Sequence, residues 1–146
     1  MCDLFAKDRQ FALATVKDGI PSVRFIDTYY EDGCFYIVTH AASRKSKEIS
    51  KNPNIALCNG ELCSFQGRAT NIGHPQDKEN EAIREKLIQV FAPWYFAHNN
   101  EDDPGMCYLK VELQSGFFHA DGIGYKVDFE KRTADASLFQ FDITST

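Results

Sequence analysis

The 146-residue sequence lacks several features that would assign it to a specialised class of protein. It has no apolar run long enough to span a membrane, and its first ten residues, MCDLFAKDRQ, lack the architecture of a signal peptide. Its net charge of −5 argues against a general nucleic-acid binder, because such proteins need a basic surface. We therefore expect a cytoplasmic protein that binds neither a membrane nor nucleic acid.

The five cysteines also lack a pattern that would hold a metal ion or build a disulfide framework. There is no CxxC pair, and no histidine lies at an interval typical of zinc ligands. Cys58 and Cys63 flank an expected turn and could meet, but thiols in the cytoplasm are normally reduced. We expect no metal site, and free thiols that pack as small apolar residues.

The length and composition are those of one globular domain, residues 1–146, with 43% hydrophobic and 13% aromatic residues. Asp18-Gly19 and Asn59-Gly60 are two-residue hairpin signals between apolar segments. Short turns between strands, interrupted once by a helix, predict a mainly β, α+β fold built as an antiparallel barrel or meander. The expected strands cover residues 11–16, 21–30, 34–38, 54–58, 62–72, 107–118 and 125–129.

The longest helical pattern runs from Gln76 to about residue 97. Pro93 should kink or end this helix, because proline lacks the backbone N–H that the helix interior needs. The aromatic cluster Trp94-Tyr95-Phe96 follows, and we expect it in the core or at a subunit interface.

The stretch CFYIVTHAASRKSKEISKNP, residues 34–53, is the expected centre of a functional site. A helix should begin after Ser43, whose hydroxyl suits an N-cap, and end before Pro53. Arg44, Lys45 and Lys47 fall in its first turns, where free N–H groups and the helix dipole already favour an anion. The three cations favour a phosphate site, and a solvated basic face fits the same spacing equally well.

Arg24 is an unexpected cation in the middle of a strand. Alternation places Val23 and Phe25 on one face of that strand, and Arg24 and Ile26 on the other. An arginine among apolar neighbours should be paired, or should face a ligand or solvent.

Three segments, in this order, resemble the pyridoxamine 5′-phosphate oxidase-like FMN-binding split-barrel family. The first is FALATVKDGIPSVRFID, with an arginine two residues after the serine that follows proline. The second is THAASRKSKEISKNP, which resembles the family's threonine, serine-arginine-lysine, helix and asparagine-proline. The third is CSFQGRATNIG, similar to the family's glycine-x-alanine strand. The resemblance covers about residues 10–75 and implies an antiparallel split β-barrel.

The resemblance also implies which residues hold FMN. The phosphate would be bound by charge-assisted hydrogen bonds from Arg24, Arg44 and Lys45, with Ser43 at the helix start and Lys47 in reserve. The isoalloxazine ring and ribityl chain would be lined by Phe25, Ile26, Val38 and Thr39. His40 is either a further flavin contact or a turn residue facing solvent. The family is usually homodimeric, with two flavins at the interface, so Trp94–Phe96 could contribute from a second subunit.

The sequence departs from the true oxidase at the positions that bind its substrate. Tyr29 stands where the oxidase has a lysine, and Leu62 falls where it has a glutamine. The oxidase's C-terminal arginine-x-histidine has no counterpart in KVDFEKRTADASLFQFDITST. These differences argue against vitamin B6 oxidation.

The leading hypothesis is therefore an FMN-dependent oxidoreductase of this class acting on an unknown small molecule, in which the flavin exchanges a hydride. The sequence identifies no catalytic residue. A non-catalytic flavin-binding protein or electron carrier is the alternative, as is a haem- or deazaflavin-binding member of the same fold. Loss of the cofactor is a further alternative, against which the retained Arg24, Ser43 and Lys45 argue.

Overall fold

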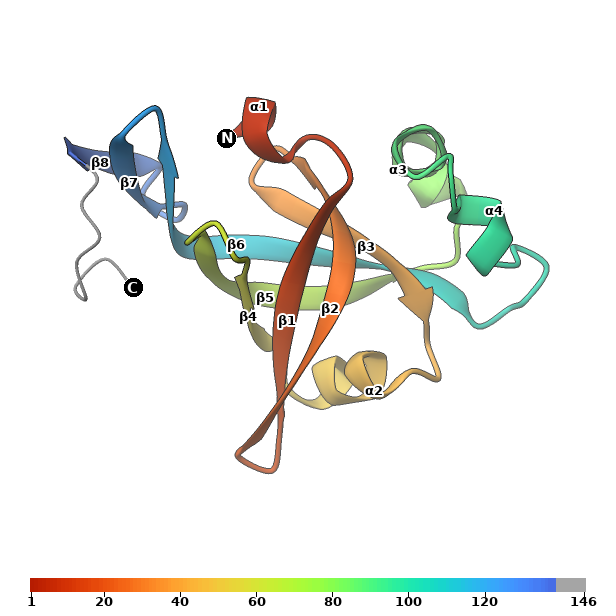
Figure 1. Cartoon of the computed structure of the whole chain (residues 1–146). Helices are drawn as coiled ribbons and strands as arrows, with labels where there is room; N and C mark the ends of the chain where they lie inside the picture. The colour runs from red at the N-terminus through yellow and green to blue at the C-terminus, as the bar shows by residue number, and fades with distance from the viewer. Residues whose placement is uncertain (139–146) are drawn as a thin grey trace.

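Six antiparallel strands form a closed barrel in the computed structural model, which describes residues 1–138 (Figure 1). The strands follow the order β3-β2-β1-β4-β5-β6, and pairing between β3 and β6 closes the barrel. Together with the helices, this architecture confirms the predicted α+β split barrel. The strand bounds are β1 Arg9–Lys17, β2 Ile20–Glu31, β3 Cys34–His40, β4 Asn54–Cys58, β5 Ser64–Gly73 and β6 Met106–Ala120.

The long strand β6 pairs with β5 over most of its length, and its two other partners lie along different halves. Residues 106–112 pair with β3, whereas residues 115–120 pair with β7, Ile123–Asp128. A further strand, β8, Thr133–Leu138, pairs with β7 and lies in a segment for which the sequence predicted no structure. Residues 139–146, the rest of that segment, lie outside the described part of the chain. Figure 1 shows this extension at one end of β6 and the helices α3 and α4 near the other.

Five helical segments complete the described chain: α1 Cys2–Phe5, α2 Arg44–Lys51, η1 Lys78–Asn80, α3 Glu81–Val90 and α4 Tyr95–His98. The prediction of one helix from Gln76 to residue 97 is wrong, because turns at residues 91–94 break the helix and separate α3 from α4. Pro93 lies in this break, as expected of a residue that cannot donate a backbone hydrogen bond. No helix within residues 1–138 is long and apolar enough to cross a membrane.

The connection between β4 and β5 also differs from the predicted two-residue turn. Cys58 pairs with Ser64, so the loop spans residues 59–63. The Asn59 side chain holds it by accepting from the backbone N–H groups of Glu61 at 3.0 Å and Cys63 at 3.2 Å. Asparagine side chains often accept hydrogen bonds from nearby backbone N–H groups in this way, so Asn59 stabilises a longer loop than the Asn-Gly sequence predicted.

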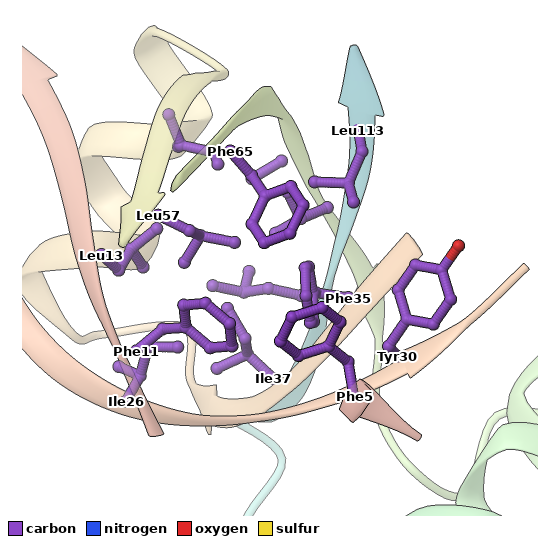
Figure 2. Close-up of a cluster of buried hydrophobic side chains, with 14 of the residues drawn as sticks. Phe5, Phe11, Leu13, Ile26, Tyr30, Phe35, Ile37, Leu57, Phe65 and Leu113 are labelled. Atoms are coloured by element: carbon purple, nitrogen blue, oxygen red, sulfur yellow. The ribbon is translucent and has the colours of Figure 1, made fainter. Parts of the chain in front are cut away.

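Aromatic rings fill the barrel interior (Figure 2). Phe35 is fully buried, and its ring centroid lies 5.1 Å from that of Phe11 and 5.5 Å from that of Phe65. Phe5, from the short α1, closes the cluster with edge-on contacts to Phe35 and Phe65. Inclined aromatic pairs at this spacing add to the free energy of burying their surface, so the rings hold the barrel strands together.

A second apolar cluster attaches α3 and α4 to the outside of the barrel. Leu87, Phe91 and Tyr95 from the helical segment are fully buried against Tyr29 of β2 and Tyr108 of β6. The predicted core role of the Trp94–Phe96 cluster is thus confirmed for its middle residue, Tyr95. Trp94 is only half-buried and donates to Asp8 at 2.8 Å, and Phe96 is 59% exposed.

A buried polar network reinforces this second cluster. Arg84 donates to both carboxylate oxygens of Glu101, at 2.6 and 2.9 Å, and the Tyr95 hydroxyl donates to Glu101 at 2.9 Å. Because the Tyr95 hydroxyl has one proton, Tyr108 must donate to Tyr95 across their 2.5 Å contact. Burial raises the pKa of Tyr108 to about 12, so both hydroxyls stay protonated and the network ties the helices to β6.

The network predicts a pH-dependent contribution to stability. Hydrogen bonds from Arg84 hold the pKa of Glu101 below its usual value of 4.5. A carboxyl whose pKa is lower in the folded state stabilises the fold above its unfolded pKa, and this contribution disappears as the pH falls through the folded value. Glu101→Gln should therefore lower the free energy of unfolding at pH 7 by about 2 kcal/mol. The deficit should shrink as the pH drops below 4.5.

Urea denaturation of the parent and the variant at several pH values measures this difference. Glu61→Gln is the matched control, because Glu61 forms an exposed ion pair with Arg9 that should contribute little. A deficit for Glu101→Gln that stays constant between pH 7 and pH 3 would show that the charge of Glu101 is not what the network needs.

Candidate cofactor-binding site

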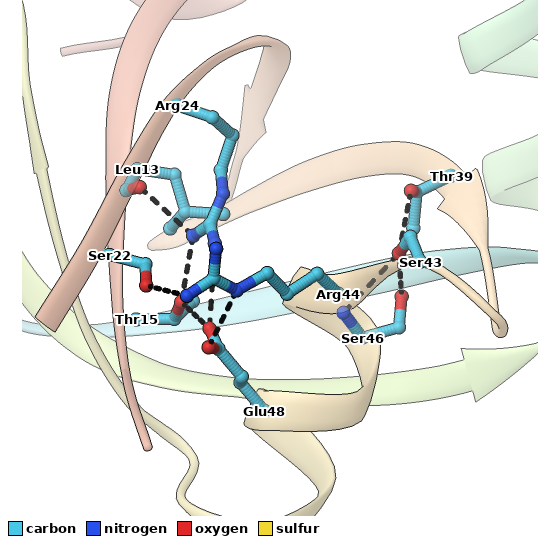
Figure 3. A network of polar contacts seen from close by, with 9 residues as sticks. All are labelled: Leu13, Thr15, Ser22, Arg24, Thr39, Ser43, Arg44, Ser46 and Glu48. Atoms are coloured by element: carbon cyan, nitrogen blue, oxygen red, sulfur yellow. Dashed lines mark hydrogen bonds and ion pairs between the residues drawn. The ribbon is translucent and has the colours of Figure 1, made fainter. Parts of the chain in front are cut away.

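Two arginines from different elements converge on one buried carboxylate beside α2 (Figure 3). Arg24 of β2 lies 3.4 Å from Oε2 of Glu48, and Arg44 at the start of α2 lies 3.2 Å from Oε1. Thr15 of β1 donates to Oε2 at 2.5 Å, and the Glu48 side chain is only 3% exposed. This hydrogen bond and those from the arginines lower the pKa of Glu48, so the carboxylate is ionised at neutral pH.

Arg24 is paired, which answers the question that its place in a strand raised. Its Nη1 donates to Thr15 at 2.7 Å and to the backbone carbonyl of Leu13 at 3.2 Å. Arg44 donates to Ser22 at 2.7 Å, but its side chain is 73% exposed and is therefore less constrained than that of Arg24. The side chain of Arg24 is therefore held in one position by its hydrogen bonds, whereas the exposed guanidinium of Arg44 can bind a ligand that arrives from solvent.

The sequence analysis did not identify Glu48 or Thr15. One signal was available for Glu48, because it follows Arg44 by four residues and so shares its helix face. The contacts of Glu48 with Arg24 and Thr15 carry no local signal, since these residues lie 24 and 33 positions away in the chain.

The start of α2 is capped as the sequence predicted. The Ser43 hydroxyl accepts from the backbone N–H of Ser46 at 3.3 Å and donates to the Ser46 hydroxyl at 2.8 Å. Ser46 in turn donates to the backbone carbonyl of His40 at 2.8 Å. The Thr39 hydroxyl lies 3.5 Å from that of Ser43 (Figure 3). These hydroxyls fix where the helix begins and therefore where its cations lie.

Unlike Arg24 and Arg44, Lys45 has no carboxylate partner in the described part of the chain. None of the ion pairs among residues 1–138 includes it, and it is half-buried. Burial, together with repulsion from Arg24, lowers the pKa of Lys45. A bound anion would relieve both effects, because it would neutralise the charge that burial and repulsion disfavour.

The predicted phosphate and ring contacts separate into two groups in the structure. Arg24, Thr39, Ser43, Arg44 and Lys45 lie around the start of α2. Other predicted contacts point elsewhere: Ile26 belongs to the barrel core, Val38 packs against the outer apolar cluster, and Phe25 is 71% exposed on the outer face of β2. Ile26 could therefore reach a cofactor only through its backbone.

His40 uses both ring nitrogens within the protein. Its Nδ1 accepts from the backbone N–H of Ala42 at 3.0 Å, so its Nε2 carries the proton and donates to Asp103 at 3.0 Å. Neither nitrogen is available to ligate an iron atom in this arrangement. Within residues 1–138, no group of three histidine, cysteine or acidic side chains could hold a metal ion.

The barrel, the cations at the start of a capped helix and the buried carboxylate define a split-barrel protein with a cluster of positive charge beside α2. The sequence profile of the pyridoxamine 5′-phosphate oxidase family matches residues 1–120. The chain belongs to this family. It is similar to general stress protein 26 of Bacillus subtilis (strain 168), with 29% identity over 104 residues that cover 69% of this chain and 72% of the relative.

Solved structures agree on the fold. A pyridoxamine 5′-phosphate oxidase-related, FMN-binding protein from Nostoc punctiforme superposes with a TM-score of 0.57 at 14% identity, covering 90% of this chain and 87% of the other. The haem storage protein HutZ from Vibrio cholerae gives a TM-score of 0.59 at 12% identity, covering 71% and 80%. At these identities the likeness establishes the shared fold and leaves the ligand to be argued from this chain's residues.

Proposed function

We propose that this protein is an FMN-binding flavoprotein and that its flavin acts as the redox centre of an oxidoreductase. The observation that carries this proposal is the charge of the site. Arg24, Arg44 and Lys45 together carry three positive charges, and Glu48 neutralises one of them, which leaves a net charge of +2 beside the start of α2. A phosphate monoester carries about −1.5 to −2 at pH 7 and would balance it.

Different residues of the site would bind different parts of FMN. Lys45 and the exposed guanidinium of Arg44 would contact the phosphate. Glu48 would orient Arg24 and Arg44 through its two ion pairs. Thr39, next to the helix cap, would contact the ribityl chain. When bound, the flavin supplies hydride or electron transfer, and the protein supplies binding and orientation.

The substrate is an unknown small molecule, and no side chain of the site is needed as an acid or base. The family relationship supports a flavin ligand, as does the FMN-binding protein with the same fold. His40, which follows Thr39, is not free to ligate a haem iron in this arrangement, because both of its ring nitrogens are already hydrogen-bonded.

We propose further that the protein works as a cytoplasmic homodimer. The outer face of the β1–β2 hairpin exposes Val23 by 68% and Phe25 by 71%, beside their cross-strand neighbours Ala14 and Ala12. Side chains of this size rarely stand together in solvent unless a partner covers them. Sedimentation equilibrium tests this proposal, because a dimer has twice the 16.6 kDa of the chain, whereas a stable monomer at micromolar concentration would contradict it.

The visible absorption spectrum of the purified protein, followed by titration of any colourless fraction with FMN, tests the function. A flavin spectrum, or saturable binding near one FMN per chain, is expected. Reoxidation by a panel of nitro compounds and quinones then separates an oxidoreductase from an electron carrier, whose reduced flavin would react with none of them. A colourless protein that does not bind FMN would refute the proposal.

A further inference from the structure

A second basic site lies on the other side of Arg44 from Lys45. A cavity of about 610 Å³ lies between α2 and Lys17 at the end of β1. Four cations line it: Lys17 from β1, and Arg44, Lys47 and Lys51 from α2. Neither Arg24 nor Lys45 lines this cavity, so it adjoins the candidate flavin site and shares Arg44 and Glu48 with it.

The spacing of the helix residues explains why these cations share one cavity. Arg44, Lys47 and Lys51 are separated by three and four positions, which places them on one face of α2. Lys45 follows Arg44 directly and therefore points about 100° away around the helix. Arg44 is the only cation that the cavity shares with the proposed flavin contacts.

The charge of this cavity is not balanced from within the protein. Its one carboxylate, Glu48, is already engaged by Arg24, Arg44 and Thr15. Within residues 1–138, no ion pair includes the lysines of the cavity, Lys17, Lys47 and Lys51. Lys47 and Lys51 also repel each other across one helical turn. This concentration of positive charge occurs in a chain whose net charge is −5.

We infer that the cavity binds a small molecule with a diphosphate group, such as a nucleoside diphosphate. Its volume lies within the range of about 300–1,000 Å³ typical of small-molecule sites. Three lysines without anionic partners suit the two or three negative charges of a diphosphate, to which lysine binds as a mobile point charge. A long nucleic acid fits less well, because the rest of the chain is acidic and would repel it.

Isothermal titration with inorganic pyrophosphate tests this inference on the whole protein, with and without saturating FMN. Pyrophosphate should bind in both conditions, and orthophosphate more weakly. Replacing two lysines, Lys47→Gln and Lys51→Gln, should weaken pyrophosphate binding about tenfold or more, because two charge-assisted contacts are lost. FMN affinity should stay within about twofold, because the proposed phosphate contacts Arg44 and Lys45 are unchanged; a larger loss would assign Lys47 to the flavin phosphate and overturn the separation of the two sites.

The control variant carries Lys126→Gln and Lys131→Gln, which removes the same charge from exposed positions on the β7–β8 hairpin. It should leave pyrophosphate binding unchanged. Pyrophosphate that binds only without FMN, and equally to the Lys47/Lys51 variant, would overturn the inference and place the anion at Lys45. If FMN fails to bind but the Lys47/Lys51 variant still loses pyrophosphate affinity, the cavity assignment stands and the flavin proposal falls.

Discussion

Alanine at both Arg44 and Lys45 is expected to abolish retention of FMN while the barrel stays folded. The double substitution removes two of the three cations and brings the net charge of the site from +2 to zero. Loss of two charge-assisted hydrogen bonds to phosphate weakens binding by about 3–6 kcal/mol, a hundredfold or more. Titration of the flavin fluorescence measures the affinity, and circular dichroism reports the fold.

The structure explains why this variant should fold. Arg44 is mostly exposed, and Glu48 keeps Arg24 and Thr15 as partners when Arg44 is removed. The single variants should differ, with Lys45→Ala losing more affinity than Arg44→Ala, because Arg44 is already hydrogen-bonded to Ser22 and Glu48. Alanine at Lys126 and Lys131 is the control for general loss of positive charge. FMN affinity equal to that of the parent in the double variant would move the phosphate site elsewhere.

Phe35→Ala is expected to reduce the free energy of unfolding by about 3–5 kcal/mol, through lost burial and the cavity left behind. Phe35 is fully buried on β3, the strand whose pairing with β6 closes the barrel. Its ring lies within 6 Å of four others, from Phe5, Phe11, Tyr30 and Phe65. Because a domain of this size is stable by only about 5–15 kcal/mol, the loss is a large part of the total.

Urea denaturation at neutral pH measures the effect of Phe35→Ala. Phe96→Ala removes the same side chain from a position that is 59% exposed, where it touches only the ring of Tyr95 among the described aromatic contacts. It should cost about 1 kcal/mol or less. Equal losses for the two variants would mean that the aromatic cluster does not determine the stability of the barrel.

Local patterns in the chain predicted most elements of the barrel. Alternation along β2 separated Arg24 and Ile26 from Val23 and Phe25, and the structure has the same two faces. The Ser43 cap was also predictable, because capping depends on neighbouring residues and their hydrogen-bonding groups. The three segments that resemble the family, taken together, were enough to predict the split barrel.

Tertiary contacts decided the features that local patterns left open. Pro93 already predicted the interruption of the helix near residues 91–94, but only the structure shows that Tyr95, just after it, is buried and hydrogen-bonded to Tyr108 and Glu101. The tail segment of β8 has no apolar alternation strong enough to predict a strand, and its pairing with β7 forms it. In both regions, contacts with another segment of the chain determined what the local pattern did not specify.

The candidate site divides in the same way. By itself the sequence determined that cations cluster at the start of a capped helix, because helix phase and capping depend on residues within a few positions of one another. Only the tertiary structure decided how those cations are compensated. It brought Thr15 and Arg24 onto Glu48, left Lys45 half-buried without a carboxylate, and opened a separate basic cavity beyond Arg44. The physical reason is that charge compensation depends on distances between atoms, and only the closed barrel sets those distances for residues far apart in the chain.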